Sequence, residues 1–550
     1  MLKRSATIAA AGTIALLSIA FGLVGSAQTP DPAALTGQVS SQEEGPMEGV
    51  LVSVKRDGST VRTTVVSNAQ GRYRFPRARL EPGRYTVRIR ALGYELANSE
   101  PLDVTAQQTT QLNLQLRKVE DISRQLTNAE WFASMPGTKE QKHHFAECVT
   151  CHTLERIVRS RYTAEEFPGV LQKMNAAGRE GEDTRPQSNT NTRTEDNDYL
   201  ASVNLSKVSR WKYPFKTLPR PKGKATRVIM TEYDLPRPTS KPHDAVVDAE
   251  GMVWYGDFNQ PYIGMLDPRT SKVVEYPVPS FKPKARKGMN NIEVDRDGNV
   301  WMALFHQAGL AKFDRQTKQI QAWKIPDDVD HVGKRTTFLA AVNYYADGKV
   351  WLGGGMDTSH RFDVKSGQWE TFDEKQHVPK DTPAAKRPHG IYDIVSDSKN
   401  NLYMLDMKSE YIIKVDAKTM QLTFNATPTM ASGPRRGHMD AQDRLWFAEH
   451  VANKVGMYDT RTGQFKEWAL PTPFGNPYDA IFDGKNDVWV GGMTSDRISR
   501  LNTTTGEIVE YLLPRETNVR RVWVDSSTTP ATFWVGNNNA ASIIKLEPLD

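Results

Sequence analysis

The stretch PHDAVVDAEGMVWYGDFNQPYIGMLDPRTSKVVEYPVP, residues 242–279, decides the fold. It contains four strand-like segments: an apolar one ending at Asp248, an aromatic one around Trp254, an apolar one ending at Asp267, and one ending at Pro279. The same order of segments returns at intervals of roughly 43 to 52 residues up to the end of the chain. Repeats of this length are typical of the four-stranded blades of a β-propeller.

The aromatic segment marks seven such units at Trp254, Trp301, Trp351, Tyr403, Trp446, Trp489 and Trp534. We therefore predict a seven-bladed propeller over residues 226–550. The seventh unit ends without a fourth strand, whereas residues 228–236 match the fourth-strand pattern of residues 508–514. We expect this N-terminal strand to complete the last blade and close the ring, which removes an unpaired sheet edge.

Residues 33–117 have a different pattern, in which short segments of alternating polar and apolar residues are separated by glycine-containing turns. This pattern predicts a small β-sandwich. The order of its glycines and turns resembles the carboxypeptidase regulatory-like domain, and the matching features are Gly37, Gly49-Val50, NAQGRY at 68–73 and PGRY at 82–85. The resemblance implies a transthyretin-like sandwich that serves spacing, binding or stability and has no catalytic residues.

Both cysteines of the 550-residue chain lie in the five residues Cys148-Val149-Thr150-Cys151-His152. This spacing suits covalent haem, because each thiol can bond one vinyl group and His152 then lies beside the iron as proximal ligand. A disulfide or thioredoxin-like pair is the alternative, but it does not explain the adjacent histidine and favours a βαβ setting. A zinc site would need further Cys or His ligands at suitable spacing.

The motif lies in residues 118–208, where apolar residues recur at helical spacing. This segment resembles small c-type cytochromes, which implies an all-α domain that binds haem c. Met174, on the expected helix after the motif, is the candidate for the second axial ligand, and its alternative role is ordinary core packing. Ligation by His143 or His144 is a further alternative. The predicted fold class is thus multidomain and mainly β, in the order sandwich, cytochrome domain and propeller.

The N-terminus has the features of a secretory signal peptide over residues 1–27. Lys3 and Arg4 precede an apolar run, and small residues follow at 25–27. No second apolar stretch approaches the roughly 20 residues that a membrane helix needs. We expect a soluble periplasmic or otherwise exported protein. The formal net charge of +6 is small for this length, and no dense basic run suggests nucleic acid as a partner.

The propeller resembles the virginiamycin B lyase (streptogramin lyase) family in the stretches PHG at 388–390, LWFAE at 445–449, NKVG at 453–456 and TGQ at 462–464. The resemblance implies that Pro-His turns of neighbouring blades and a glutamate gather with Mg²⁺ at one mouth of the channel, where a histidine is the general base. His389 and Glu449 match this pattern. Arg435 stands where the second histidine is expected, and an arginine stays protonated and cannot act as a base.

We expect five residues to line this mouth and to suit a small polar or anionic ligand: His243, His389, Arg435, Glu449 and Tyr478. The alternative is that they are solvated turn residues. The leading functional prediction is an exported c-type haem protein that transfers electrons to or from a redox partner protein, with the propeller as a binding platform. The alternatives are a propeller enzyme, either a lyase or a haem-coupled dehydrogenase, and a non-catalytic protein that binds carbohydrate or cell-wall material.

Overall fold

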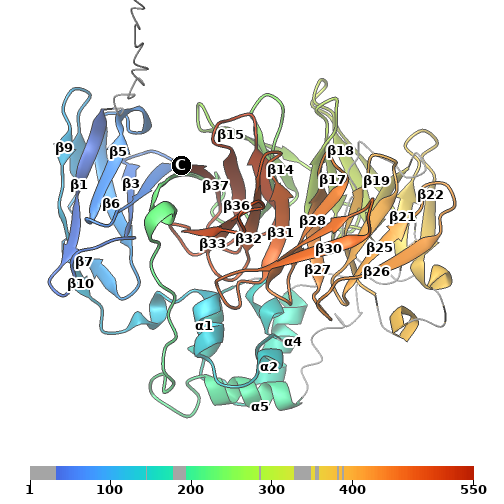
Figure 1. The fold of residues 1–550 in the computed structure, drawn as a ribbon, viewed down its shortest axis with the longest axis horizontal. Coiled ribbons are helices and arrows are strands. Elements are labelled where there is room, and N and C mark those ends of the chain that lie inside the picture. The colour runs from blue at the N-terminus through green and yellow to red at the C-terminus, as the bar shows by residue number, and fades with distance from the viewer. Residues whose placement is uncertain are drawn as a thin grey trace, which may run out of the picture.

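The computed structural model describes residues 32–98, 100–143, 145–150, 152–177, 194–283, 287–326, 349–353, 358–378, 380, 383–386 and 389–550. The predicted signal peptide and Cys151 lie outside these residues. The described chain consists of a β-sandwich, a propeller-like ring of sheets, and a group of helices on one face of that ring (Figure 1). In the described part of the chain, no helix is long and apolar enough to cross a membrane.

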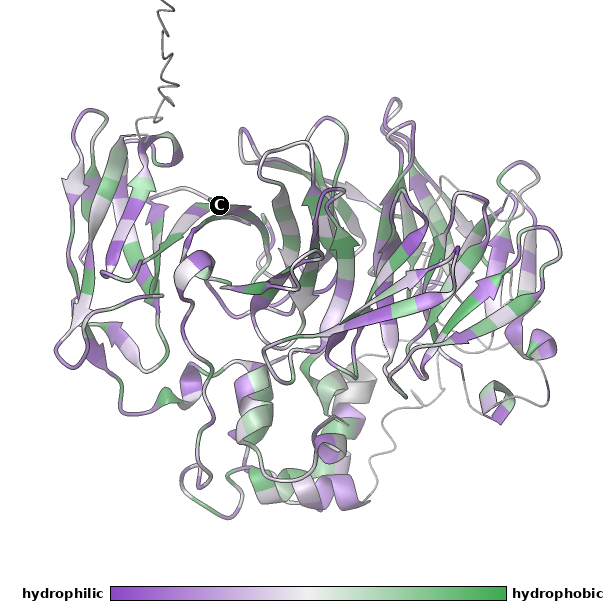
Figure 2. Cartoon of the chain, in the orientation of Figure 1, coloured by the Kyte–Doolittle hydropathy of each residue, from purple (hydrophilic) through white to green (hydrophobic). Residues whose placement is uncertain are grey.

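The N-terminal body is the predicted β-sandwich. Its strands are β1 Ala33–Ser41, β2 Gly45–Pro46, β3 Leu51–Arg56, β4 Val61–Val66, β5 Arg72–Pro76, β6 Gly83–Arg90, β7 Tyr94–Leu96, β8 Leu102–Val104, β9 Thr110–Gln111 and β10 Leu114–Lys118. Strand β1 is central in one sheet, and β4, β3, β6 and β8 form the other in that order. Along β5, Tyr73 and Phe75 are buried while Arg72 and Arg74 are exposed. This alternation places one face of the strand in the core. Figure 2 shows hydrophilic and hydrophobic residues side by side along the strands of the sandwich.

The propeller has six blades with sheets of their own. Their strands are β12 Pro242–Val247, β13 Val253–Asp257, β14 Tyr262–Asp267 and β15 Lys272–Pro277; β16 Asn291–Val294, β17 Val300–Leu304, β18 Gly309–Phe313 and β19 Ile320–Lys324; β20 Val350–Gly353, β21 Thr358–Phe362 and β22 Trp369–Asp373; β23 Ile391–Ser396, β24 Leu402–Asp406, β25 Tyr411–Val415 and β26 Leu422–Ala426; β27 Pro434–Met439, β28 Arg444–Glu449, β29 Lys454–Asp459 and β30 Gln464–Ala469; and β31 Pro477–Phe482, β32 Asp487–Gly492, β33 Arg497–Asn502 and β34 Ile508–Leu512. In every blade the strands are antiparallel neighbours in chain order.

In the first, second and fifth blades the repeated tryptophan is bonded to an aspartate of its own blade, and its ring packs against other aromatic rings. Trp254 Nε1 donates to Asp248 Oδ2 at 2.9 Å, and Trp301 and Trp446 make the equivalent bond to an aspartate six residues earlier. The same Trp254 ring lies 5.1 Å from the ring of Phe313 in the second blade. The aspartate that ends the first strand therefore satisfies the indole N–H, and the ring itself fills the space between blades.

The seventh blade closes the ring as predicted. It consists of β35 Val522–Asp525, β36 Thr532–Asn537, β37 Ser542–Pro548 and the early strand β11 Val228–Asp234, which pairs antiparallel with β37. Strand β11 also pairs with β4 of the sandwich, from Ile229 opposite Val65 to Tyr233 opposite Val61. One eight-stranded sheet therefore runs from the propeller into the sandwich, a connection that sequence patterns did not predict.

The segment between the sandwich and β11 contains η2 Ile122–Arg124, α1 Asn128–Ser134, α2 Lys139–His143, η3 Ala146–Thr150, α3 Leu154–Val158, α4 Phe167–Ala177 and α5 Thr194–Val203. We call residues 119–217 the helical segment. Thr127 caps α1 and forms a reciprocal capping box with Glu130. Trp131 on α1 is buried against the rings of Trp211 and Phe215, at 5.1 and 5.9 Å between centroids.

Candidate functional site

The CVTCH motif lies where η3 ends and α3 begins. Cys148 is half-buried, Val149 is fully buried, and His152 is half-buried two residues before Leu154 starts α3. His152 Nδ1 lies 2.9 Å from the Thr153 carbonyl, which can only accept, so Nδ1 carries the proton and Nε2 keeps its lone pair. Burial lowers the pKa of His152 and favours the neutral ring. These are the tautomer and charge state of a metal-binding imidazole.

An apolar cluster joins the motif to the propeller. Val149, Phe132 and Leu154 pack in one buried core with Tyr478 and Met493 of the sixth blade. Figure 1 shows the helices α1, α2, α4 and α5 below the ring, on one face of it. The propeller thus provides one side of the hydrophobic core of the helical segment.

Two hydrogen bonds fasten the same contact. The amide of Ala129 donates to the Thr494 carbonyl at 2.8 Å, and Asn518 Nδ2 donates to the Val149 carbonyl at 2.9 Å. Asn518 is fully buried, as is Val149. The second bond therefore ties the seventh blade to the main chain between the two cysteines.

Under the helical segment, one position repeats around the propeller face. In four described blades the innermost strand has a bulge near its start. Pro242, Ile391, Pro434 and Pro477 each stand opposite the last residue of the second strand of their blade. The next residues in these four blades are His243, Tyr392, Arg435 and Tyr478.

Three of the five predicted mouth residues meet there. His243 Nδ1 donates to Asp244 Oδ1 at 2.5 Å, and its Nε2 accepts from the hydroxyl of Tyr478 at 3.1 Å. Tyr478 is also hydrogen-bonded to the hydroxyl of Tyr392. The Arg435 guanidinium covers both tyrosine rings, at 4.5 and 4.1 Å from their centroids. Arg435 also donates to Nε2 of His450 at 2.9 Å.

The predicted ligand mouth is not open in this structure. His243, Arg435 and Tyr478 are between 0 and 2% exposed, and Tyr478 packs in the apolar cluster of the helical segment. Burial lowers the pKa of His243 to about 4, against the opposing effect of Asp244, and raises the pKa of Tyr478. The sequence alone did not indicate that another part of the chain occupies this face.

His389 and Glu449 are not brought to this group by any described contact. His389 lies two residues before the start of β23, where its Nδ1 donates to Asp406 Oδ2 at 2.6 Å and its ring packs against Phe424. The strand register aligns His243 with Tyr392 and not with His389, because Pro242 and Ile391 both stand opposite the last residue of the second strand. The signal was in the sequence, since Tyr392-Asp393 repeats the pattern of Tyr478-Asp479.

Glu449 is the last residue of β28 and is fully buried. Neither carboxylate oxygen has a hydrogen-bond partner within the described residues. Burial, with the nearby charge of Glu467, raises the pKa of Glu449 to about 8, so the carboxyl is neutral near pH 7. Among the residues that the structure describes, no group of three or more His, Cys, Asp or Glu could hold a metal ion.

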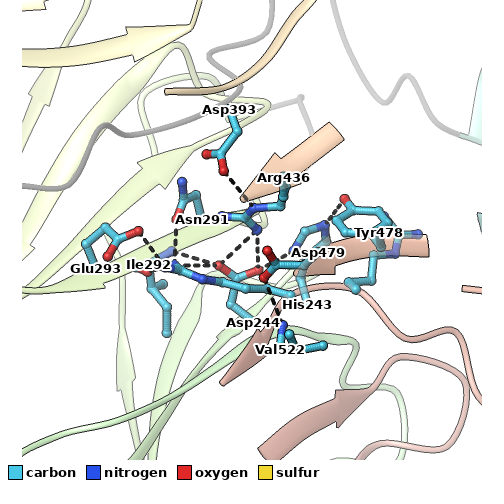
Figure 3. Close-up of polar contacts among 12 residues, drawn as sticks. His243, Asp244, Asn291, Ile292, Glu293, Asp393, Arg436, Tyr478, Asp479 and Val522 are labelled. Atoms are coloured by element: carbon cyan, nitrogen blue, oxygen red, sulfur yellow. Dashed lines mark hydrogen bonds and ion pairs between the residues drawn. The ribbon is translucent and has the colours of Figure 1, made fainter. Parts of the chain in front are cut away.

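Below this ring of residues, the channel is filled by charges from facing blades (Figure 3). Asp244 Oδ2, Asp393 Oδ2 and Asp479 Oδ2 each accept from a main-chain N–H of the following described blade, at 3.1 to 3.2 Å. Arg436 reaches across the ring to Asp244 at 3.3 Å, and Arg521 pairs with Asp244 and with Glu293.

The electrostatic balance of this channel network differs from one carboxylate to the next. Burial opposes the charge of Asp244, but Arg436, His243 and Arg521 hold its pKa well below the usual range. Burial raises the pKa of Asp393 to about 6, because its contact with Arg436 is longer, at 3.8 Å. The network joins the blades through the centre of the ring and fills the channel with paired side chains.

Met174 lies in α4, but its side chain is outside the described part of the structure, as is Cys151. The residues that sequence analysis missed are Tyr392, Asn518 and Arg520. Asn518 and Arg520 precede β35 in the seventh blade, and nothing in the repeat pattern distinguishes them from turn residues. Asn518 bonds the helical segment directly, and Arg520 bonds Asn518.

Two family models match parts of the chain. The carboxypeptidase regulatory-like domain matches residues 34–117, and the virginiamycin B lyase family matches residues 378–548. Among curated proteins, no sequence matches this chain.

Solved structures of streptogramin lyases are similar to the propeller. One streptogramin B lyase structure has 20% sequence identity and a TM-score of 0.50, and covers 59% of this chain and 99% of its own. The virginiamycin B lyase of Staphylococcus aureus has 21% identity, a TM-score of 0.49, and covers 58% of this chain and 99% of its own. At this identity the likeness concerns the fold alone. The chain thus combines a carboxypeptidase regulatory-like sandwich with a propeller of the virginiamycin B lyase type.

Proposed function

We propose that this chain is an exported haem c protein that exchanges electrons with a redox partner protein, and that its propeller supports the haem-binding segment. One observation carries the proposal: the CVTCH motif lies in an apolar contact between helices and propeller, with Nδ1 of His152 bonded to a main-chain carbonyl. Export follows from the signal peptide expected over residues 1–27.

The residues of the motif fit haem c. Cys148 and Cys151 would hold it through thioether bonds, and His152 Nε2 would ligate the iron, with Met174 proposed as the second ligand. A bound haem supplies reversible one-electron exchange between Fe(III) and Fe(II). The protein itself orients His152 through the Thr153 carbonyl and excludes water with Val149 and its neighbours. The motif lies between helical turns, which does not favour a thioredoxin-like pair.

The geometry does not favour lyase chemistry. The neighbouring-blade positions at which the lyase resemblance implies histidines hold Tyr392 and Arg435. Arginine remains protonated and cannot remove a proton from a substrate. Because these side chains are covered by the helical segment, we propose that this face of the propeller serves the haem-binding segment and not a free polar ligand. No specific observation favours the dehydrogenase or carbohydrate-binding alternatives.

The test is covalent haem on the full-length chain. The protein is produced in a host that matures c-type cytochromes, denatured, and extracted with acid acetone, and the protein fraction is examined by its pyridine haemochrome spectrum. We expect haem to stay with the wild-type chain. Single variants Cys148→Ala and Cys151→Ala should retain one thioether and show a band at longer wavelength, because one vinyl group remains conjugated.

The control is the double variant of both cysteines, which should release all haem on extraction. Variant His152→Ala should keep the covalent bonds, whereas the native, undenatured variant should lose the absorption spectrum of a His-ligated iron. If the wild-type chain releases all its haem, or carries none, the proposed function is wrong.

A further inference from the structure

The seventh blade holds the main chain of the attachment motif. Asn518 donates to the Val149 carbonyl from a fully buried position, and this carbonyl lies between Cys148 and Cys151 in the chain. Because buried amide and carbonyl groups are nearly always paired, this bond fixes the place of the motif on the propeller.

A buried arginine, Arg520, lies next to Asn518. Arg520, 3% exposed, donates from Nε to Asn518 Oδ1 at 2.7 Å and lies over the rings of Phe258 and Tyr478, at 5.4 and 5.7 Å. The Arg520 guanidinium therefore places a buried positive charge beside the amide that holds the motif.

The seventh blade also contains a buried side-chain amide without a hydrogen-bond partner among the described residues. Asn538 is 1% exposed, and neither its Nδ2 nor its Oδ1 has a hydrogen-bond partner within the described residues. It directly follows β36, the second strand of its blade. In other blades the same position holds Phe258, His450 and Met493, which contact His243, Arg435 and the helical cluster respectively. Asn538 therefore belongs to the ring of residues under the helical segment.

We infer that the seventh blade is the wall of the haem site that receives the propionate groups, with Asn538 and Arg520 binding these carboxylates and Asn518 holding the motif. This inference rests on the proposed function, since it requires haem at Cys148–His152. A carboxylate accepts hydrogen bonds from an amide and pairs with a guanidinium, so it supplies the partner that Asn538 Nδ2 lacks. The charge of Arg520 favours the reduced, less positive iron and raises the reduction potential.

The experiment uses the full-length, haem-loaded chain and measures the midpoint potential as a function of pH by optical redox titration. The variants are Arg520→Gln, Arg520→Lys and Asn538→Leu. The matched control is Arg444→Gln, because the Arg444 guanidinium lies over Trp446 and Phe482, at 5.5 and 5.3 Å, just as Arg520 lies over two rings. Arg444 has no described contact with the helical segment.

We expect Arg520→Gln to shift the redox equilibrium three- to tenfold toward the oxidised form, the upper value corresponding to about 59 mV for one electron. Arg520→Lys should recover most of this shift, because it restores the charge. Asn538→Leu should move the pH dependence of the potential to higher pH, since loss of a hydrogen bond to an ionised propionate raises the pKa of that group. Arg444→Gln should match the wild type.

Two results would overturn the inference, and they are distinguishable. If covalent haem is present but Arg520→Gln and Asn538→Leu match the wild type in potential and pH profile, the propionate wall is wrong and the proposed function stands. If the wild-type chain carries no covalent haem, both are wrong. Should Asn538→Leu fail to fold, the two Arg520 variants decide the question.

Discussion

The sandwich and the helical segment are both attached to the propeller, but by different means. The sandwich joins through main-chain pairing, because β11 lies between β37 of the propeller and β4 of the sandwich. The helical segment joins through side-chain packing on the propeller face, with few hydrogen bonds. The first joint continues a propeller sheet into the sandwich, whereas the second packs helices against one face of the propeller.

The sandwich joint contains a buried group of charges. Glu232 of β11 accepts from Arg62 of β4 at 2.9 Å and from Arg515 at 2.6 Å, and Lys55 pairs with Asp234 at 2.6 Å. The Arg62 and Glu232 side chains are 8% and 1% exposed. Continuous main-chain pairing and buried ion pairs leave the sandwich little freedom to move relative to the seventh blade.

The largest expected effect comes from breaking this joint. Variant Glu232→Ala leaves Arg62 and Arg515 without their buried counter-ion, and loss of one partner of a buried pair costs about 3–5 kcal/mol. We expect a lower urea midpoint and faster proteolytic cleavage between sandwich and propeller. The control is Glu507→Ala, because its half-exposed bridge to Lys224 contributes little. Equal midpoints for the two variants would show that the buried charges do not hold the joint.

The helical joint should respond to a core truncation without disturbing the sandwich. Leu154 is fully buried in the cluster shared with Tyr478 and Met493, so Leu154→Ala should cost about 2–3 kcal/mol through lost contacts and a cavity. Hydrogen exchange should rise in α1 and α3 but stay unchanged in β4 and β11. Arg156→Ala, at an exposed position of the same helix, is the control. Faster exchange in β4 would mean that the two joints are not independent.

The charged side chains in the channel should make the stability of the whole propeller depend on pH, and this effect should not distinguish the sandwich joint from the helical joint. Because the pKa of Asp393 is raised to about 6 from 3.8, the folded chain binds more protons than the unfolded chain between these values, and its contribution to stability falls as pH rises through this range. Asp393→Asn should therefore be more stable than the wild type by about 3 kcal/mol well above pH 6.

This difference should disappear below pH 3.8, where the carboxyl is protonated in both states. Urea unfolding across the pH range measures it, with Asp297→Asn at an exposed turn as the control. A difference that grows as pH falls would contradict the assignment of Asp393.

The smallest expected effect is at the single bond from the seventh blade to the motif. Asn518→Ala removes the donor to the Val149 carbonyl and should weaken the helical joint by about 1 kcal/mol. Hydrogen exchange of residues 145–158 measures the change. Asn539→Ala removes a similar bond, to Glu516, at a place with no described contact with the motif, and should leave this exchange as in the wild type. Equal hydrogen exchange in both variants would show that the Asn518 bond does not stabilise the contact between the helical segment and the propeller.

Sequence patterns were sufficient for the propeller because its repeat is local. The spacing of Trp254, Asp248 and the turns between them describes one blade, and seven copies imply a ring. The closing strand β11 was predictable for the same reason, since it carries the missing outer-strand pattern. Contacts link His243, Arg435 and Tyr478, three of the five expected mouth residues, whereas the strand register gives the position expected for His389 to Tyr392.

The sequence by itself determined the sandwich, the closed ring and the CVTCH motif, because alternation, blade repeat and ligand spacing are each contained in a short stretch of chain. Only the tertiary structure decided that β4 pairs with β11 and that the helical segment covers the face with Tyr478 and Arg520. These contacts join residues hundreds of positions apart. They depend on which surfaces fit each other, and that fit has no signature in the local pattern of either partner.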